Sequence, residues 1–284
     1  MSQPIFAGYF RNGMPYNRMG HGPRPLIVFQ GLMLENKPQP EWAFNLAAGM
    51  YKFLRADYTV YSVLRKPGLP QGYTLADMAN DYAVMIREEF GGPVDVLGIS
   101  TGGSIVQHFA ADHSDLVRRL IIHSAAYTLS DSAKQLQLKL GEFAAQRQWI
   151  KAWALLMGAV LPQRGIKKIL SRPLIWLFAP LMALGAPKDP TDVIITVEAE
   201  DRFNFKDRLH EITMPTLIAA GELDPFYTPT LFRETAAGIP HAKLCLYPNM
   251  GHPAGGKQFQ QDVLTFLSSK RWRPSCSVST SRTG

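Results

Sequence analysis

The sequence predicts an α/β protein with a doubly wound, mostly parallel sheet and a helical insertion. Short apolar runs rich in β-branched residues recur along the chain, and turn residues bound each of them. Between these runs, apolar residues recur at spacings of three and four, which is typical of amphipathic helices. Strands that alternate with helices indicate a parallel sheet. The length of 284 residues and the 46% hydrophobic content fit one large domain, with or without an insertion.

The expected elements begin with an antiparallel hairpin, in which an Asn-Gly turn separates AGYFRNG from MPYNRMG. Buried strands are then expected over 25–31, 58–64, 93–100, 118–126, 215–221 and 242–248. Amphipathic helices are expected over 41–54, 74–90, 102–117, 228–239 and 256–270. Thr74 is a candidate helix cap, with Asp77 three residues later as a weak form of the capping box.

One long segment, 127–205, breaks the alternation and is mostly helix-forming. Its one convincing strand is VIITV, at 193–197. The apolar stretch 173–187 is shorter than the ~20 residues needed to cross a bilayer, and Pro180 interrupts it. We therefore expect a helical cap packed on the main domain. The predicted organisation is a core domain in two parts, the cap insertion between them and a disordered tail, with the boundaries 1–126, 127–205, 206–269 and 270–284.

The net charge of +7 is unevenly distributed along the chain. The tail has four cations and no acid, and 127–187 has eight Lys and Arg against two acids. A nucleic-acid-binding protein should carry its positive charge on the binding face, so a nucleic-acid partner is not expected. The two cysteines, Cys245 and Cys276, are expected to be free thiols, and with the lack of a signal-peptide pattern they favour the cytoplasm.

The stretch VDVLGISTGGSI places Ser100 where a buried strand should pass directly into a helix. Such a sharp turn strains the residue at the corner and requires very small neighbours, which Gly98 and Gly102 supply. The serine hydroxyl is then presented at the carboxyl edge of the sheet, where parallel sheets bind their ligands. The positive end of the following helix favours negative charge that develops there.

With this Gly-x-Ser-x-Gly nucleophile elbow, the chain resembles the α/β-hydrolase family up to about residue 269. In that family the acid and then the histidine follow the serine along the chain. GELDPFYTP places Asp224 after one predicted strand, and NMGHPAG places His252 after the next. The resemblance therefore implies Ser100 as nucleophile, His252 as base and Asp224 as its orienting acid. Glu222 is the rival acid. His123 is expected to line the pocket or to lie in the core, and the remaining histidines are expected to be structural.

The resemblance also implies donors for an oxyanion. The backbone N–H of Thr101 is one candidate, and Leu32 in QGLM is the other, with Met33 behind it. Gln30 stands where the family commonly has histidine, which leaves the local hydrogen bonding open. The candidate pocket residues are Met33, His123, Trp149, Trp153, Trp176 and Phe226.

The predicted function is hydrolysis of carboxylic esters of small to medium apolar substrates, through an acyl-enzyme and without metal or cofactor. Two alternatives remain: a carbon–carbon (meta-cleavage type) hydrolase with the same triad, and a non-catalytic ligand receptor on this fold. The oligomeric state stays open. The insertion has two possible roles. It could be a lid that rests on an anionic membrane through Lys167, Lys168 and Arg172, with Leu174, Trp176 and Phe178 below them. We prefer the alternative, a closed cap over the pocket.

Overall fold

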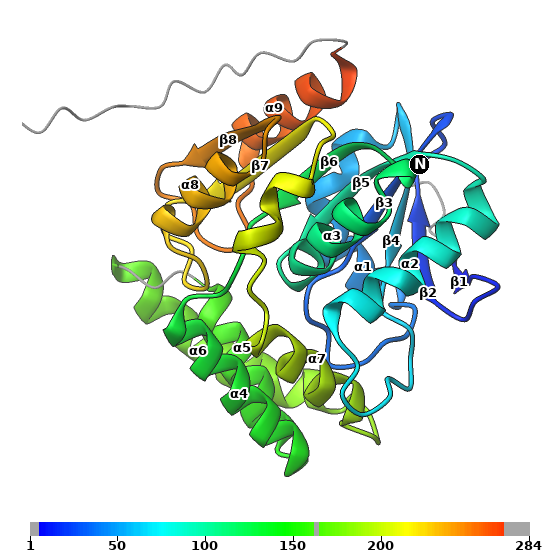
Figure 1. Cartoon of the computed structure of the whole chain (residues 1–284). Coiled ribbons are helices and arrows are strands. Elements are labelled where there is room, and N and C mark those ends of the chain that lie inside the picture. Colours follow the sequence, from blue (N-terminus) through cyan, green and yellow to red (C-terminus); the bar gives the residue numbers. More distant parts are fainter. Residues whose placement is uncertain (1–5, 162–164, 270–284) are drawn as a thin grey trace, which may run out of the picture.

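The computed structural model describes residues 6–161 and 165–269 and has a central eight-stranded sheet with helices on both faces (Figure 1). The strand order is β1-β2-β4-β3-β5-β6-β7-β8, and the six strands from β4 to β8 in this order run parallel. This architecture confirms the predicted fold class. The strands are β1 Phe6–Tyr9, β2 Pro15–Met19, β3 Arg24–Phe29, β4 Tyr58–Val63, β5 Val94–Ile99, β6 Val117–His123, β7 Thr216–Gly221 and β8 Ala242–Tyr247.

The predicted hairpin is present at the edge of the sheet. β1 pairs antiparallel with β2, and β2 pairs antiparallel with β4. Gly13 in the connecting turn has φ +85°, a conformation that glycine adopts without strain.

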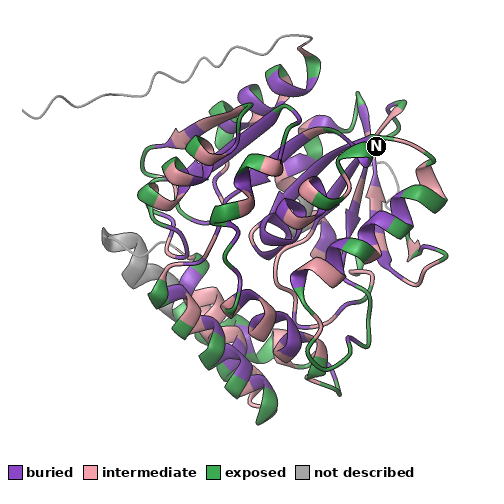
Figure 2. Ribbon diagram, in the orientation of Figure 1, coloured by how far each residue is buried: buried purple, intermediate pink, exposed green. Residues whose placement is uncertain are grey.

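Helices cover the two faces of the sheet. They are α1 Glu41–Ala47, α2 Leu75–Phe90, α3 Thr101–Asp112, α8 Pro229–Gly238 and α9 Gly256–Ser268, with 3₁₀ segments η1 Ala48–Leu54, η2 Ser114–Leu116 and η3 Lys206–Glu211. Alternate residues of β3 enter opposite apolar layers: Ile27 and Phe29 pack with α2 and α3, whereas Leu26 and Val28 pack with α1, η1 and α9. Figure 2 shows the central strands as continuously buried, and every residue of β5 and β7 is buried.

The N-terminus of α2 is more firmly capped than the sequence indicated. The Thr74 hydroxyl oxygen accepts a hydrogen bond from the Asp77 N–H (3.1 Å), and the Asp77 carboxylate accepts one from the Thr74 N–H (2.9 Å). This is a complete capping box, which satisfies two N–H groups that a helix end otherwise leaves unpaired.

In the described part of the predicted insertion, between β6 and β7, four helices gather beyond one end of the sheet (Figure 1). They are α4 Asp131–Ala145, α5 Trp149–Val160, α6 Gly165–Ala183 and α7 Thr191–Asp201. Among the described residues, no helix has the length and apolarity that a membrane span requires.

The prediction of a strand over 193–197 is wrong, because VIITV lies inside α7. The residues before it start a helix: the Asp189 side chain accepts hydrogen bonds from the N–H and hydroxyl of Thr191 (3.0 and 2.6 Å), and Asp192 lies in the first turn. Val193 and Val197 then pack against α4. Capping and burial outweigh the strand preference of β-branched residues.

The expectation of free thiols is also wrong for Cys245. This buried residue of β8 is disulfide-bonded. The cysteines therefore no longer favour a reducing compartment. Its partner and the predicted disordered tail lie outside the described residues.

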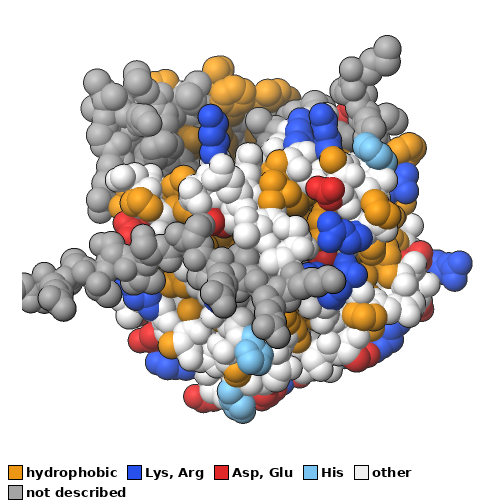
Figure 3. All heavy atoms as spheres, turned by 90° about the horizontal axis from the view of Figure 1, so that it is seen from above, with side chains coloured by type: hydrophobic (Ala, Val, Ile, Leu, Met, Phe, Trp, Pro, Cys, Tyr) orange, Lys and Arg blue, Asp and Glu red, His pale blue; other side chains and the backbone are white. Residues whose placement is uncertain are grey.

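Charged side chains lie in the interior of the fold as well as on its surface. Buried Asp95 on β5 pairs with Arg118 (2.8 Å) and Arg119 (3.6 Å) of the neighbouring strand β6. In the view of Figure 3, blue Lys and Arg side chains stand beside red acidic ones at several places.

Candidate active site

Ser100 lies at the corner between β5 and α3, in a conformation that few non-glycine residues adopt. Its backbone has φ +53° and ψ −125°. A Cβ on Gly98 would lie 2.4 Å from the Gly102 carbonyl oxygen, and one on Gly102 would lie 2.0 Å from that of Phe29. Both glycines are therefore required for the strand and the helix to approach each other. The backbone N–H of Ser100 donates to the carbonyl of His123 (3.0 Å), which fixes the corner to β6.

His252 and Asp224 reach this serine from the loops after β8 and β7. His252 Nε2 lies 3.0 Å from Ser100 Oγ, and His252 Nδ1 lies 2.7 Å from Asp224 Oδ2. The other carboxylate oxygen of Asp224 accepts hydrogen bonds from the N–H groups of Phe226 (2.9 Å) and Tyr227 (3.2 Å). These bonds hold the carboxylate toward the imidazole, so the three side chains can pass a proton from the hydroxyl to His252.

The rival acid, Glu222, does not take part in this arrangement. Its side chain is exposed, and its backbone N–H bonds to the Tyr247 carbonyl within the sheet extension. The structure thus pairs His252 with Asp224.

Of the two positions expected for His123, the structure shows the core: the residue is completely buried and does not line the pocket. Its Nε2 lies 2.7 Å from the Ala254 carbonyl, and its Nδ1 lies 2.7 Å from the Tyr51 hydroxyl. Because a carbonyl can only accept, Nε2 carries the proton and Nδ1 accepts from Tyr51. Burial lowers the pKa of His123 to about 3, so the imidazole is neutral.

The loop after His252 is held twice. Besides the bond from His123, the N–H of Ala254 donates to the hydroxyl of Ser124 (2.9 Å), the residue after β6. Ser124 has φ +50°. His123 and Ser124 are therefore positioning residues for the His252 loop.

Arg65 fixes the loop after β3 through hydrogen bonds to its backbone. This fully buried guanidinium donates from Nη1 to the carbonyl oxygens of Gln30 (3.3 Å) and Gly31 (3.0 Å). The Gln30 side chain donates to the hydroxyl of Ser62 (2.5 Å), which settles the hydrogen bonding that the sequence left open. Within the described chain, the backbone N–H groups of Leu32 and Thr101 donate to no protein acceptor, so both are available to a ligand.

A second buried network lies at the start of α3. The carboxylate of Glu200, on α7, accepts hydrogen bonds from the hydroxyls of Thr101 (2.7 Å) and Ser104 (3.0 Å). Burial raises the pKa of Glu200, while these hydroxyls, the Gln137 amide and the charge of Arg65 oppose the rise. The cap is thereby joined to the helix that follows Ser100.

Ser100 and His252 open onto a cavity of about 400 Å³ between the sheet and the cap. Met33, Trp153 and Phe226 line it, as predicted. Sequence reasoning missed much of its wall, which comes mainly from α4, α5 and the loops after β3 and β8. Among the described residues, the lining consists of Gln30, Gly31, Leu32, Met33, Met50, Ile99, Ser100, Leu136, Gln137, Leu140, Trp153, Leu156, Met157, Val160, Phe226, His252 and Pro253.

Two other predicted pocket residues lie outside this lining. Trp149 packs in the apolar cluster between the loop after β3 and the cap helices. Trp176 has a side chain that is 70% exposed on α6, because this part of the helix turns its apolar residues outward.

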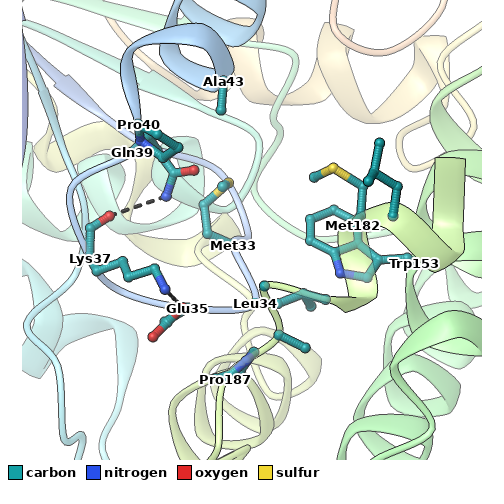
Figure 4. A pocket seen from close by; sticks show the side chains of 13 residues that line it. Met33, Leu34, Glu35, Lys37, Gln39, Pro40, Ala43, Trp153, Met182 and Pro187 are labelled. Carbon is teal, nitrogen blue, oxygen red and sulfur yellow. Dashed lines mark hydrogen bonds and ion pairs between the residues drawn. The ribbon is translucent and has the colours of Figure 1, made fainter.

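A second cavity of about 300 Å³ adjoins the first, and Met33 and Trp153 line both. It lies between the loop after β3 and the end of α6, where Met33, Met182 and Trp153 surround the space (Figure 4). Glu35 and Lys37 at its rim form an ion pair. Asn17 fixes this loop through reciprocal hydrogen bonds with the Gln39 backbone (2.8 Å each).

A mostly parallel sheet with a strained strand–serine–helix corner defines the class of α/β hydrolases. Residues 31–257 match the model of the Alpha/beta hydrolase family, and the chain belongs to this family.

Relatives cover nearly the whole chain at low identity. A 2-hydroxy-6-oxononadienedioate/2-hydroxy-6-oxononatrienedioate hydrolase of Pseudomonas sp is 23% identical, with 93% of this chain and 95% of that protein covered. An alpha/beta hydrolase enzyme from a Medee basin deep-sea metagenome library is similar in structure, with TM-score 0.75, 17% identity and 96% and 100% coverage. The enol-lactonase from Burkholderia xenovorans LB400 has TM-score 0.74, 17% identity and 93% and 100% coverage.

Proposed function

We propose that the protein hydrolyses carboxylic esters of small to medium apolar substrates through an acyl-enzyme on Ser100. The observation that carries this proposal is the continuous chain of hydrogen bonds from Ser100 through His252 to Asp224, at the edge of a mostly apolar cavity. A hydroxyl is a weak nucleophile at neutral pH, and an adjacent imidazole oriented by a carboxylate activates it.

Each residue then has a defined role. His252 Nε2 takes the proton as Ser100 Oγ bonds to the ester carbonyl carbon, and Asp224 stabilises the imidazolium. The N–H groups of Thr101 and Leu32 donate to the oxyanion. The intermediate collapses, the C–O bond of the ester breaks, and His252 returns its proton to the departing alcohol. Water, deprotonated by His252, releases the acid and restores Ser100.

A second candidate is carbon–carbon bond hydrolysis by the same three residues. It is favoured by the Pseudomonas relative, whose name describes the hydrolysis of a diacid. Against it, the described residues that line the cavity include no lysine and no arginine, so none of them offers a counter-charge to a buried substrate carboxylate. An uncharged ester meets no such penalty.

The decisive experiment compares p-nitrophenyl esters of graded acyl length with a dienoic ketone substrate of the meta-cleavage type. We expect multiple turnovers on the esters, a burst of one p-nitrophenol per active site where deacylation is slow, and no cleavage of the ketone. Faster cleavage of the ketone would replace ester hydrolysis with the second candidate. A single turnover on every substrate would support the third reading, a ligand receptor on this fold.

A further inference from the structure

A fully buried guanidinium lies behind the loop that carries Leu32, one of the two proposed oxyanion donors. Arg65, two residues after β4, is 1% exposed. Its Nη1 donates to the carbonyl oxygens of Gly31 (3.0 Å) and Gln30 (3.3 Å), whereas its Nε and Nη2 have no hydrogen-bond partner among the described residues. A buried charge without a carboxylate partner costs free energy, so stability alone does not account for an arginine here.

The guanidinium remains charged in these surroundings. Burial lowers the pKa of Arg65, and the charges of Glu200 and Asp192 on α7 are among those that oppose the effect. The ordinary pKa of arginine is so high that the side chain is not deprotonated in proteins. A full positive charge therefore lies against the backbone of the loop after β3.

The Gly31 carbonyl and the Leu32 N–H belong to one peptide group. This peptide is trans, so its C=O and N–H point in opposite directions. Because the carbonyl is turned toward Arg65, the N–H is turned away from it. Gly31 and Leu32 both line the cavity, and a Cβ on Gly31 would lie 3.2 Å from Ser100 Cβ and 3.8 Å from Ser100 Oγ. Arg65 thus fixes the direction of a donor beside the candidate nucleophile.

The charge of Arg65 also affects the strength of this donor. A hydrogen bond from a cation to a carbonyl oxygen polarises the peptide and strengthens its N–H as a donor. The oxyanion would lie one peptide group away from the guanidinium, in an interior where charges are weakly screened. The ester carbonyl is uncharged, whereas the oxygen of the tetrahedral intermediate is negative, so the intermediate gains more from this charge than the substrate does.

We propose that Arg65 is a positioning residue for the oxyanion: it directs the N–H of Leu32 toward the developing negative charge and stabilises that charge through the Gly31–Leu32 peptide. This inference rests on the proposed acyl-enzyme at Ser100. The contribution of Arg65 is expected in the stabilisation of the transition state and not in the binding of the uncharged substrate.

Two substitutions at Arg65 differ from each other mainly in charge. Lysine and methionine have side chains of similar length, but only lysine keeps a positive charge and a donor. We expect Arg65→Met to lower kcat/KM on p-nitrophenyl butanoate about a hundredfold, and Arg65→Lys to retain at least about tenfold more activity than Arg65→Met. Arg24→Met is the matched control, because Arg24 also donates to a backbone carbonyl, that of Leu267 (3.4 Å), at the opposite end of β3. It should leave kcat/KM within about twofold.

A trifluoromethyl ketone and the matching trifluoromethyl alcohol separate this role from a purely structural one. The ketone forms a negatively charged hemiketal with a nucleophilic serine, whereas the alcohol has a similar shape and forms no adduct. In Arg65→Met the inhibition constant of the ketone should rise about as much as kcat/KM falls, and that of the alcohol should change less than about threefold. Equal losses for the two compounds would overturn the inference, and so would equal activity of the Met and Lys variants.

A measurement on the unaltered protein decides the matter even if both Arg65 variants fail to fold. Labelling with [1-¹³C]glycine and [¹⁵N]leucine selects the two Gly-Leu pairs of the chain, Gly31-Leu32 and Gly68-Leu69. When the ketone forms its adduct, the Leu32 amide proton should shift downfield. The Leu69 amide proton, whose N–H already donates to Asp192 (2.8 Å), should not shift.

An unchanged Leu32 signal in a protein that has formed the adduct would overturn the inference. A protein that neither hydrolyses esters nor forms the adduct would instead refute the proposed function, so the two failures are distinguishable.

Discussion

The buried histidine behind the candidate site predicts a specific loss of stability in acid. His123 is completely buried, uses both ring nitrogens in hydrogen bonds and stacks on Phe259 with ring centroids 4.4 Å apart. Burial, with a smaller contribution from nearby His252, lowers its pKa to about 3. In the unfolded chain the same group has a pKa of about 6.5.

The sign and size of the effect follow from this difference. Below about pH 6.5 the His123 imidazole is protonated in the unfolded chain but stays neutral in the folded protein. Stability that is present at neutral pH is therefore lost as the pH falls toward 3. At about pH 4.5, which is two pH units below the pKa in the unfolded chain, protonation of this histidine stabilises the unfolded state by about 3 kcal/mol. This is a large part of the 5–15 kcal/mol by which folded proteins are typically stable.

Urea unfolding of the unaltered protein and of His123→Gln, at pH 7 and at about pH 4.5, measures this contribution. Glutamine can accept from Tyr51 and donate to Ala254, but it does not titrate. The unaltered protein should lose about 3 kcal/mol more than the variant between the two pH values, since other groups cancel in the comparison. His241→Gln, at an exposed position, should behave like the unaltered protein. Equal losses in all three proteins would refute the argument.

The remaining predictions concern the candidate site and its neighbouring cavity. Ser100→Ala should abolish ester turnover and change the free energy of unfolding in urea by less than about 1 kcal/mol, since the corner accepts a small side chain; residual hydrolysis above a trace would exclude Ser100 as nucleophile. Asp224→Asn should lower kcat by several orders of magnitude, because it favours the wrong imidazole tautomer, and Glu222→Gln should change it less than about twofold; the reverse order would reassign the acid. Met182→Trp should fill the second cavity (Figure 4) and lower the ratio of decanoate to butanoate hydrolysis about tenfold; an unchanged ratio would mean that long acyl chains do not enter it.

The three residues of the candidate site, Ser100, Asp224 and His252, could be found from the sequence because each lies at the end of a strand that glycine or proline marks. Ser100 lies between Gly98 and Gly102, and Asp224 and His252 each precede a proline. The carboxyl ends of parallel strands meet at one edge of the sheet, and the resemblance to the α/β-hydrolase family, with its order of serine, acid and histidine along the chain, supplied the assignment of the three residues.

The supporting residues could not be found this way, since their roles depend on how the cap packs on the core. Glu200 follows a β-branched run that favours a strand, and only the start of α7 at Asp189 and Asp192 argues for a helix. Gln137 is one of several polar residues on α4, and Arg65 follows β4 without any motif. His123 ends a strand, but it faces the layer of α9 and not the pocket.

The exposed apolar side chains of α6 bear on whether the cap binds a lipid surface. We expected the apolar residues of the cap to cover the pocket, and α5 does so with Trp153, Leu156 and Met157. On α6, however, Trp176, Leu177, Phe178 and Leu181 are exposed, and so is Leu184 just after the helix, at 84%. The side chains of Lys167, Lys168, Arg172 and Leu174 lie outside the described residues.

Because α5 and not the exposed face of α6 covers Ser100, we still predict that catalysis needs no interface. The rate on dispersed esters should saturate normally below their solubility limit, and Trp176→Ser should not change it. Co-sedimentation with phosphatidylserine vesicles at low salt measures the surface separately, since attraction of cations to anionic lipid is worth about 1 kcal/mol each and is screened by salt. A jump in rate at the onset of micelles or emulsion, abolished by Trp176→Ser, would contradict the prediction and make α6 an interfacial lid.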